Sequence, residues 1–231
     1  MAILILLLTV AFAASPLASD GFNGFTPSQF PVVHQEWPIQ PAGWAFAIWG
    51  LIYLGLIASA GFGLLRRPAA PDWAAMRPAL AVSLGVGTFW IAVAQVSPPL
   101  ATAMIVVMLA GALAALLRAG PEDRLWLRAP LGLYAGWLTA ATGVAIGVLL
   151  GGYGVLAPTT AALVMLPVVL ILALSVARRC PDTPTYPAAV AWALVGIAAE
   201  AMRTQNFSVA GMAIAGIVLL AINPLRRVLR S

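Results

Sequence analysis

Residues 43–65 read GWAFAIWGLIYLGLIASAGFGLL, without a single charged side chain. A transmembrane helix needs about 20 predominantly apolar residues, so this stretch predicts a helix that crosses a lipid bilayer. Other stretches of the chain have the same character. The eight predicted spans are residues 1–18, 43–65, 78–97, 99–117, 129–150, 155–177, 185–202 and 208–225. We therefore expect an all-α fold, a polytopic integral membrane bundle of about eight transmembrane helices.

The composition excludes a soluble globular domain. Of the 231 residues, 62% are hydrophobic and 8% are charged, and the mean hydropathy is +1.00. A soluble domain carries about 25% charged residues, so we expect most of this surface to face membrane lipid. One cysteine and one histidine are too few for a disulfide framework or a multi-histidine metal site. We therefore expect no metal and no required cofactor.

The charge pattern predicts the orientation of the chain. All 12 basic residues are arginine, and only Arg203 follows an odd-numbered span. The other 11 follow even-numbered spans: Arg66, Arg67, Arg77, Arg118, Arg124, Arg128, Arg178, Arg179, Arg226, Arg227 and Arg230. Positively charged loops stay in the cytoplasm, so we expect a bacterial inner (cytoplasmic) membrane, with the C-terminus inside. Because the arginines are dispersed between spans, we expect no nucleic-acid partner.

Residues 1–18 are open to two interpretations. The apolar core is followed by small residues, as in a cleaved signal peptide, but no Lys or Arg precedes it. We expect a retained helix, whereas cleavage would leave seven spans. The longest stretch outside the spans is the loop 19–42, which we expect to lie on the bundle or at the lipid interface because it is rich in aromatic residues. It holds Phe22, Phe25, Phe30, His34, Glu36 and Trp37.

Ionisable groups are rare inside the predicted spans. Glu200 is the only acidic residue placed in a span, and Arg203 follows it at i+3 on the same helix face. The two form either a local ion pair at the membrane interface or a contact for a ligand or a proton. His34 is either a solvated group or a haem ligand or pH sensor. Because intramembrane charges usually mark ion pathways, their scarcity argues against an ion-coupled pump, and no catalytic motif indicates an enzyme.

The tryptophans are the unusual part of the apolar fraction. Some lie near span ends, where an aromatic belt is expected: Trp37, Trp44, Trp73 and Trp126. Others lie about mid-span, where the indole N–H needs a partner: Trp49, Trp90 and Trp137.

Two of the mid-span tryptophans share a helix face with a tyrosine. Trp49 and Tyr53 are four residues apart, and Tyr134 and Trp137 are three apart. These faces either wall a pocket for a flat apolar ligand, with Thr142 as a polar contact, or simply pack helix against helix.

Two motifs resemble one known family. QPAGWAFAIWGLIYLGL at residues 40–56 is similar to the start of the second helix of TspO/MBR proteins, and LYAGWLTAAT at residues 133–142 is similar to their fifth-helix motif. SPPL at residues 97–100 resembles their turn between the third and fourth helices. This family comprises the tryptophan-rich sensory proteins and the related mitochondrial translocator protein (peripheral benzodiazepine receptor). The matching positions in the two motifs are Pro41, Gly43, Trp44, Phe46, Trp49, Tyr53, Tyr134, Trp137, Ala141 and Thr142.

The resemblance implies a division of the chain. Residues 1–151 correspond to the family's five-helix membrane bundle, with the outside loop 19–42 as a lid over its pocket. Residues 152–231 would add three further helices. One departure is Ala145, which stands where the family pattern has asparagine. Family members are often dimeric, so a homodimer is also implied.

The resemblance implies a function as well. Family members bind porphyrins, haem-type tetrapyrroles and sterol-like lipids, and they are linked to sensing, regulation and transport more than to catalysis. We therefore predict a hydrophobic small-molecule ligand, such as a tetrapyrrole or a lipid, and no enzymatic activity. The predicted ligand-binding residues are Trp44, Phe46, Trp49, Tyr53, Trp90, Tyr134, Trp137 and Thr142. The alternatives are a small-molecule permease and an accessory structural subunit of a membrane complex.

Overall fold

The computed structural model describes residues 1–18 and 21–228, with side chains up to residue 222. Every regular element within these residues is helical, which confirms the predicted all-α bundle. The long helices are α1 (Ala2–Ala14), α2 (Ile48–Leu65), α4 (Arg77–Val96), α5 (Pro98–Arg118), α6 (Ala129–Gly152), α7 (Pro158–Arg179), α8 (Thr185–Arg203) and α9 (Phe207–Val228). The short elements are α3 (Pro71–Ala74), the 3₁₀ turns η1 (Ser15–Ala18), η2 (Pro27–Gln29) and η3 (Gly43–Ala47), and the π-helical turn η4 (Arg124–Arg128).

The long helices follow the order of the predicted spans. Among the described residues, six segments are long and apolar enough to cross a membrane: Gly43–Leu65, Pro71–Val96, Pro98–Arg118, Arg124–Gly152, Pro158–Arg179 and Thr185–Arg203. Shorter apolar helices cover Ala2–Ala18 and Phe207–Ile222. Proline begins both α5 and α7, because the first N–H of a helix has no intrahelical acceptor to lose.

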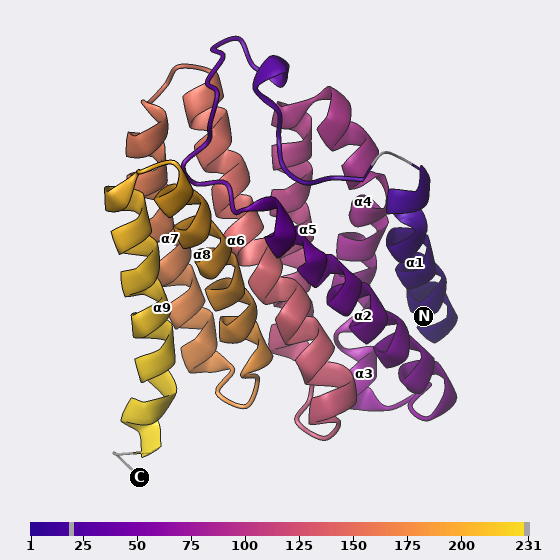
Figure 1. The fold of residues 1–231 in the computed structure, drawn as a ribbon. Coiled ribbons are helices and arrows are strands. Elements are labelled where there is room, and N and C mark those ends of the chain that lie inside the picture. Colours follow the sequence, from indigo (N-terminus) through magenta and orange to yellow (C-terminus); the bar gives the residue numbers. More distant parts are fainter. Residues whose placement is uncertain (19–20, 229–231) are drawn as a thin grey trace.

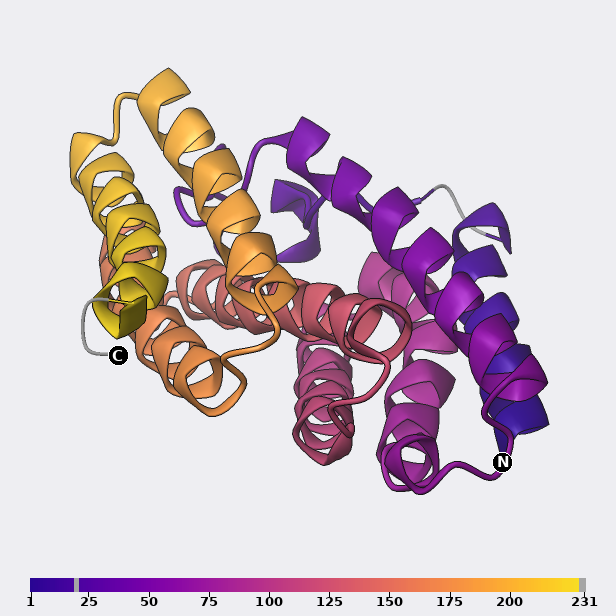
Figure 2. The ribbon, with the colours of Figure 1, turned by 90° about the horizontal axis from the view of Figure 1, so that it is seen from below.

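Five of the helices form a closed ring, and α6 is the member shared with the rest of the fold. Helix α1 packs on α2 and α4, α4 packs on α5, and α6 closes the ring by packing on α2 and α5. Helices α7 and α8 pack against the other side of α6, and α9 packs on α7 and α8 (Figure 1). Seen from below, α6 lies between the two groups (Figure 2). Its span is 72% buried, against 33–50% in the other five, so α6 is the core of the bundle.

Helix α6 presents small residues to α8 and large aromatic residues to the ring. Towards α8, Gly132 and Gly136 bring the backbones so close that a Cβ on Gly136 would clash with the carbonyl oxygen of Tyr186. The hydroxyl groups of Thr139 and Tyr186 lie 2.9 Å apart in the same interface. Small residues and interhelical hydrogen bonds are the usual means of helix association in membranes. Towards the ring, the corresponding face carries large aromatic side chains.

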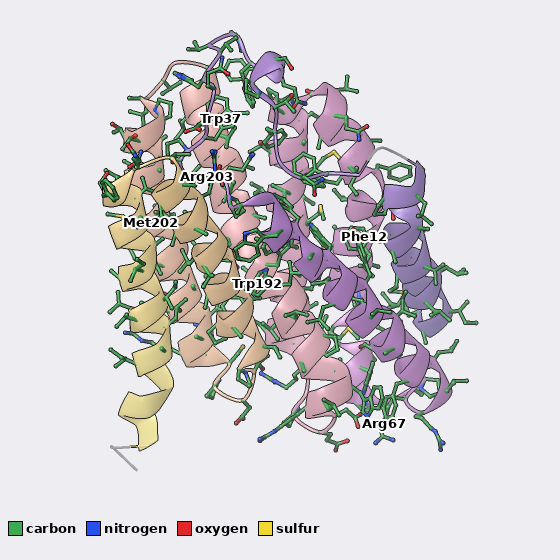
Figure 3. The ribbon with its side chains drawn as sticks, viewed as in Figure 1. Phe12, Trp37, Arg67, Trp192, Met202 and Arg203 are labelled. Carbon is green, nitrogen blue, oxygen red and sulfur yellow. The ribbon has the colours of Figure 1, made fainter. Side chains whose placement is uncertain are left out.

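The described arginines separate to opposite ends of the bundle, as the sequence predicts. Arg67 lies at one end and Arg203 towards the other (Figure 3). Arginines at the ends or starts of α2, α4, α5, α6 and α7 share the end of Arg67, which we call the arginine-rich end. The side chains of Arg226, Arg227 and Arg230 lie outside the described residues. The other end is the lid end, because the loop before α2 crosses it.

The lid loop, residues 21–42 of the described chain, is tied to three helices. The amide of Gln29 donates to two carbonyl oxygens at the end of α4, at 2.8 and 3.1 Å. The N–H of Val32 donates to the last residue of α6, and the N–H of Ala42 donates to Gly196 in α8, each at 3.0 Å. The loop also buries four large side chains: Phe25, Phe30, Trp37 and Ile39. It therefore lies on the bundle, as its aromatic content predicts.

Candidate functional site

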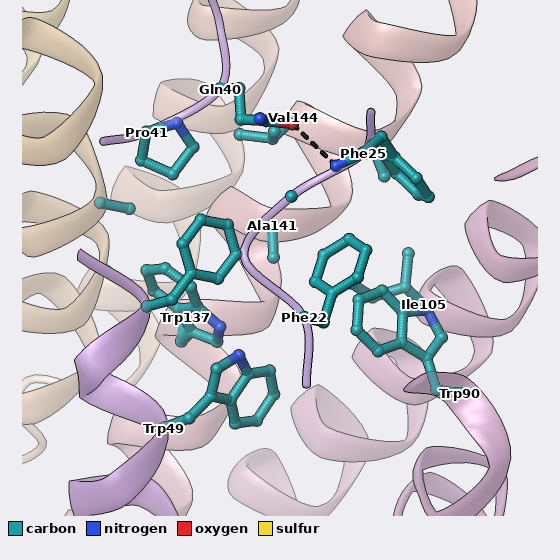
Figure 4. A pocket seen from close by; sticks show the side chains of 14 residues that line it. Phe22, Phe25, Gln40, Pro41, Trp49, Trp90, Ile105, Trp137, Ala141 and Val144 are labelled. Carbon is teal, nitrogen blue, oxygen red and sulfur yellow. Dashed lines mark hydrogen bonds between the residues drawn. The ribbon is translucent and has the colours of Figure 1, made fainter. Parts of the chain in front are cut away.

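A cavity lies beneath the lid loop, between the ring helices and α8 (Figure 4). We call it the aromatic cavity, because six aromatic side chains from the ring and the lid wall it together with small and aliphatic residues. Its lining consists of Phe22, Gly24, Phe25, Gln40, Pro41, Phe46, Trp49, Trp90, Ile105, Trp137, Ala141, Val144, Ala145 and Ala193. None of these side chains ionises, so the cavity suits an uncharged apolar group.

The rings face one another edge to face. Trp137 lies 6.1 Å from Trp49 and 5.7 Å from Phe46, measured between centroids, with interplanar angles near 80°. On the facing wall, Phe22 of the lid loop lies 4.8 Å from Trp90. Edge-to-face pairs of this kind are favourable beyond the area that they bury. The same rings can therefore pack against one another in this conformation and offer their faces to a flat ligand.

The aromatic cavity is narrow in this conformation. Its volume is about 30 Å³, room for only a water or two. A second cavity of about 170 Å³ lies on the α1 side, and the two share Phe22, Phe46, Trp49 and Trp90. Pockets for drug-sized ligands are usually about 300–1,000 Å³, so a ligand must displace some of these rings or the lid loop.

One polar group in the aromatic cavity has no partner. The side chain of Trp137 is 2% exposed, and its indole Nε1–H finds no acceptor among the described residues. The indole of Trp90, by contrast, donates to the carbonyl oxygen of Ala101 at 2.9 Å. A buried donor without an acceptor costs roughly 1–3 kcal/mol. The cavity thus contains a hydrogen-bond donor that a ligand could satisfy.

The structure brings five of the predicted ligand-binding residues together. Phe46, Trp49, Trp90 and Trp137 line the aromatic cavity, and Tyr53 lines the second cavity beside them. The Trp49 and Tyr53 rings stack at 5.4 Å with an interplanar angle of 19°, as their four-residue spacing predicts. The interpretation of these faces as pocket walls therefore has a geometric basis.

The other three predicted residues line neither cavity. Trp44 is half exposed and contacts Trp192 of α8. Tyr134 is fully buried, and its hydroxyl lies 2.8 Å from that of Ser83 in α4, so it packs helix against helix. Thr142 is also buried, and its hydroxyl has no partner among the described residues.

Several lining residues escaped the sequence analysis. Phe22 and Phe25 come from the lid loop, whose aromatic content was the only signal that it covers the bundle. Ile105 and Ala193 lie in no motif that the sequence analysis singles out. Ala193 belongs to α8, so the C-terminal helices contribute directly to the wall of the cavity.

An ion cluster joins α8 to the lid loop. The predicted Glu200–Arg203 pair is confirmed, with the closest N–O distance at 2.6 Å, and Arg203 also reaches Glu36 of the lid loop at 3.2 Å. The Arg203 side chain is 61% exposed, and exposed ion pairs contribute about 0–1 kcal/mol. The cluster therefore connects the lid loop to α8 but contributes little to the stability of that contact.

The arginine-rich end has a more buried polar network. Asp123, just before η4, accepts hydrogen bonds from Arg67 Nε and Trp73 Nε1, both at 2.8 Å. The hydrogen bond from Arg67, supported by that from Trp73, lowers the pKa of the Asp123 carboxyl. Trp73 is only 1% exposed, so it belongs to this network and not to the aromatic belt that the sequence predicts. The network fixes the start of α6 to α2 and α3.

The fold and the site define a class of protein: a polytopic membrane bundle with an aromatic cavity beneath a lid loop. Within the described residues, no group of three or more His, Cys, Asp or Glu could hold a metal ion. The TSPO-like protein family matches residues 1–225, and the chain belongs to this family. The match continues through the C-terminal helices, beyond the motifs that carry the resemblance. Searches among curated proteins and among solved structures give no match.

Proposed function

We propose that this membrane protein binds a flat, hydrophobic ligand, a tetrapyrrole or a lipid-like molecule, in the aromatic cavity. The observation that carries the proposal is the unpartnered Trp137 N–H in a cavity walled by aromatic rings. A ligand with a hydrogen-bond acceptor would satisfy this donor while its apolar body replaces the contacts between rings. Binding of this kind serves a sensory, regulatory or transport role.

The absence of ionisable side chains from the cavity lining favours binding over chemistry. General acid–base or nucleophilic catalysis needs a titratable or nucleophilic side chain at the reacting atoms, and the lining offers an amide and indole groups. The TSPO-like family is likewise not typically enzymatic. The same lining gives a proton-coupled permease no group to titrate.

The distribution of arginine supports a location in a bacterial inner membrane, with the arginine-rich end and the C-terminus in the cytoplasm. The aromatic cavity then lies near the outer surface, under the lid loop. Assembly into a homodimer, which the family resemblance implies, stays a prediction.

Titration with protoporphyrin IX, read by quenching of tryptophan fluorescence, tests the proposal. The protein is reconstituted in lipid nanodiscs, and empty nanodiscs give the partition blank. We expect saturable quenching in the wild-type protein. Trp137→Phe should weaken binding about tenfold, the loss of one hydrogen bond that the cavity leaves for the ligand.

Trp126→Phe is the matched control, since Trp126 stacks on Phe62 near the arginine-rich end, away from both cavities. It should bind protoporphyrin IX like the wild-type protein. Equal affinity of the wild-type protein, Trp137→Phe and Trp126→Phe for protoporphyrin IX would contradict binding in the aromatic cavity. Binding no stronger than to empty nanodiscs would contradict the proposed ligand class, and co-purification with a stable protein partner would then favour the accessory subunit.

A further inference from the structure

A third cavity, which is polar, opens beside the aromatic cavity at the lid end. We call it the polar cleft; it has a volume of about 170 Å³ and lies between the lid loop and the end of α8. Its lining consists of Asn23, Phe25, Pro27, Gln35, Glu36, Trp37, Gln40, Pro41, Gly43, Glu200 and Arg203. It therefore gathers the ion cluster of the lid end in one place.

The polar cleft and the aromatic cavity share a wall. Phe25, Gln40 and Pro41 line both of them, and the side-chain carbonyl oxygen of Gln40 accepts the backbone N–H of Phe25 at 3.0 Å (Figure 4). A single hydrogen bond within the lid loop thus closes part of the wall. One molecule could occupy both spaces if the Gln40 side chain turned aside.

Two buried indoles that line these spaces, Trp37 and Trp137, have an N–H without an acceptor among the described residues. Trp37 in the polar cleft is 5% exposed, and its Nε1–H, like that of Trp137 in the aromatic cavity, has no acceptor among the described residues. Both orphan groups are donors. A ligand that satisfies them must bring acceptors, one on its body and one on its head.

Arg203 already holds a carboxylate that can leave. Glu36 of the lid loop bonds Arg203 through a single 3.2 Å contact, whereas Glu200 receives both the Nε and the Nη2 donors at 3.1 and 2.6 Å. The Glu36 side chain is 47% exposed, so it can return to water at little cost. Exchange of Glu36 for a ligand carboxylate would leave the net charge around Arg203 unchanged.

We propose that the aromatic cavity and the polar cleft form one site for an anionic amphiphile, whose apolar body lies against Trp137 and whose carboxylate replaces Glu36 on Arg203, beside Trp37. This rests on the proposed function and names the chemistry of the ligand's head. Arg203 and Ala193 both belong to α8, so the C-terminal helices supply the head-group contact and part of the wall. Because Glu36 is part of the lid loop, binding of the head also releases one tie that holds the loop to α8.

Three pyrene probes that differ only in their head group test this proposal: 1-pyrenecarboxylate, 1-pyrenemethanol and 1-pyrenemethylammonium. Binding to protein in nanodiscs is read by energy transfer from tryptophan, with empty nanodiscs as the blank. The wild-type protein should bind the carboxylate about fivefold more tightly than the alcohol, and the ammonium no better than the alcohol. Arg203→Gln should abolish the preference for the carboxylate.

Glu36→Gln provides a test of opposite sign. It removes the competing carboxylate, so 1-pyrenecarboxylate should bind about threefold more tightly, while the alcohol should bind as before. Glu36 is exposed on the lid loop, so this variant stays informative even where Arg203→Gln fails to fold. Arg118→Gln, which removes an arginine at the other end of the bundle, is the control and should keep the wild-type preference.

The outcomes separate this inference from the proposed function. Equal affinities for all three probes, each weakened by Trp137→Ala, which removes the ring that the apolar body contacts, would overturn the head-group site and leave the aromatic cavity in place. A preference for the ammonium, or weaker binding of the carboxylate to Glu36→Gln, would also overturn the exchange. No effect of Trp137→Ala on any probe would count against the aromatic cavity itself.

Discussion

The two sides of α6 differ in how they pack: one side contacts α8 closely, and the other faces the aromatic cavity of the ring. Towards α8, small residues let two backbones meet, and the hydroxyl groups of Thr139 and Tyr186 satisfy each other. Towards the ring, Trp137 leaves a narrow cavity and an unpartnered N–H. The contact between α6 and α8 is thus complete without a ligand, and the ring side of α6 is not. Stability and binding are therefore expected to respond to mutations on different faces of one helix.

The largest effect is expected where α6 meets α8. Gly136→Ala places a Cβ against the carbonyl oxygen of Tyr186, which backbone atoms cannot relieve by a rotamer change. We expect destabilisation of about 3 kcal/mol, measured by thermal unfolding in detergent. Gly85→Ala is the matched control, because nothing lies within 4 Å of its Cβ, and it should be neutral or stabilising by about 0.5–1 kcal/mol. Similar unfolding of both variants would contradict the close approach of α8.

A smaller effect is expected from the hydrogen bond in the same interface. Tyr186→Phe removes the hydroxyl that lies 2.9 Å from Thr139. Interhelical hydrogen bonds in membranes contribute about 0.6 kcal/mol on average, so denaturation in mixed micelles should show a loss near that value. Tyr153→Phe is the control, because Tyr153 is exposed at the end of α6. If Tyr153→Phe lost more stability than Tyr186→Phe, the hydrogen bond between Thr139 and Tyr186 would not stabilise the interface.

The ring side can be probed by comparing two indoles. Trp90→Phe breaks a hydrogen bond to the Ala101 carbonyl oxygen, while Trp137→Phe removes a donor that has no partner. Both substitutions remove a similar area, so Trp90→Phe should be more destabilising by about 1 kcal/mol. Unfolding of the two variants in the absence of ligand measures the difference. If Trp137→Phe were the more destabilising, its N–H would already have a partner.

The smallest effect is expected at the start of α6, and it depends on pH. The pKa of Asp123 lies below its ordinary value of 3.8 in the folded protein, chiefly because of the hydrogen bond from Arg67. The resulting stabilisation is complete above about pH 4 and is lost as the pH falls through the folded pKa. Thermal unfolding between pH 3 and pH 6 should show this loss. Asp123→Asn should be less stable than the wild-type protein at pH 6 and should lose less stability on acidification, whereas Glu122→Gln should behave like the wild-type protein.

The helices could be predicted from the sequence because each apolar run ends at arginines, prolines or glycines. The pairing of Trp49 with Tyr53 also followed from spacing, since four residues make about one helical turn. The family resemblance, by contrast, predicted Trp44 as a ligand-binding residue, and the structure places it in the 3₁₀ turn η3, half exposed and in contact with Trp192 of α8. Trp44 therefore lines neither cavity, while Trp49 lines both.

The remaining features depend on contacts between distant parts of the chain. Trp73 is buried because Asp123 accepts its N–H from a loop 50 residues away. Ala193 lines the cavity only because α8 packs on α6. The donor of Trp137 is unpartnered because no acceptor from a neighbouring helix reaches it. None of these relations leaves a periodic signal in the sequence.

The most direct measurement is the response of the indole N–H resonances to ligand. In protein labelled with ¹⁵N-tryptophan, the resonance of each side chain is assigned from a Trp→Phe variant, and protoporphyrin IX is then added. The resonance of Trp137 should show the largest change, as its unpartnered donor gains an acceptor, and that of Trp126 should stay in place. A Trp137 resonance that does not move while protoporphyrin IX binds saturably would contradict the assignment of the aromatic cavity as the binding site.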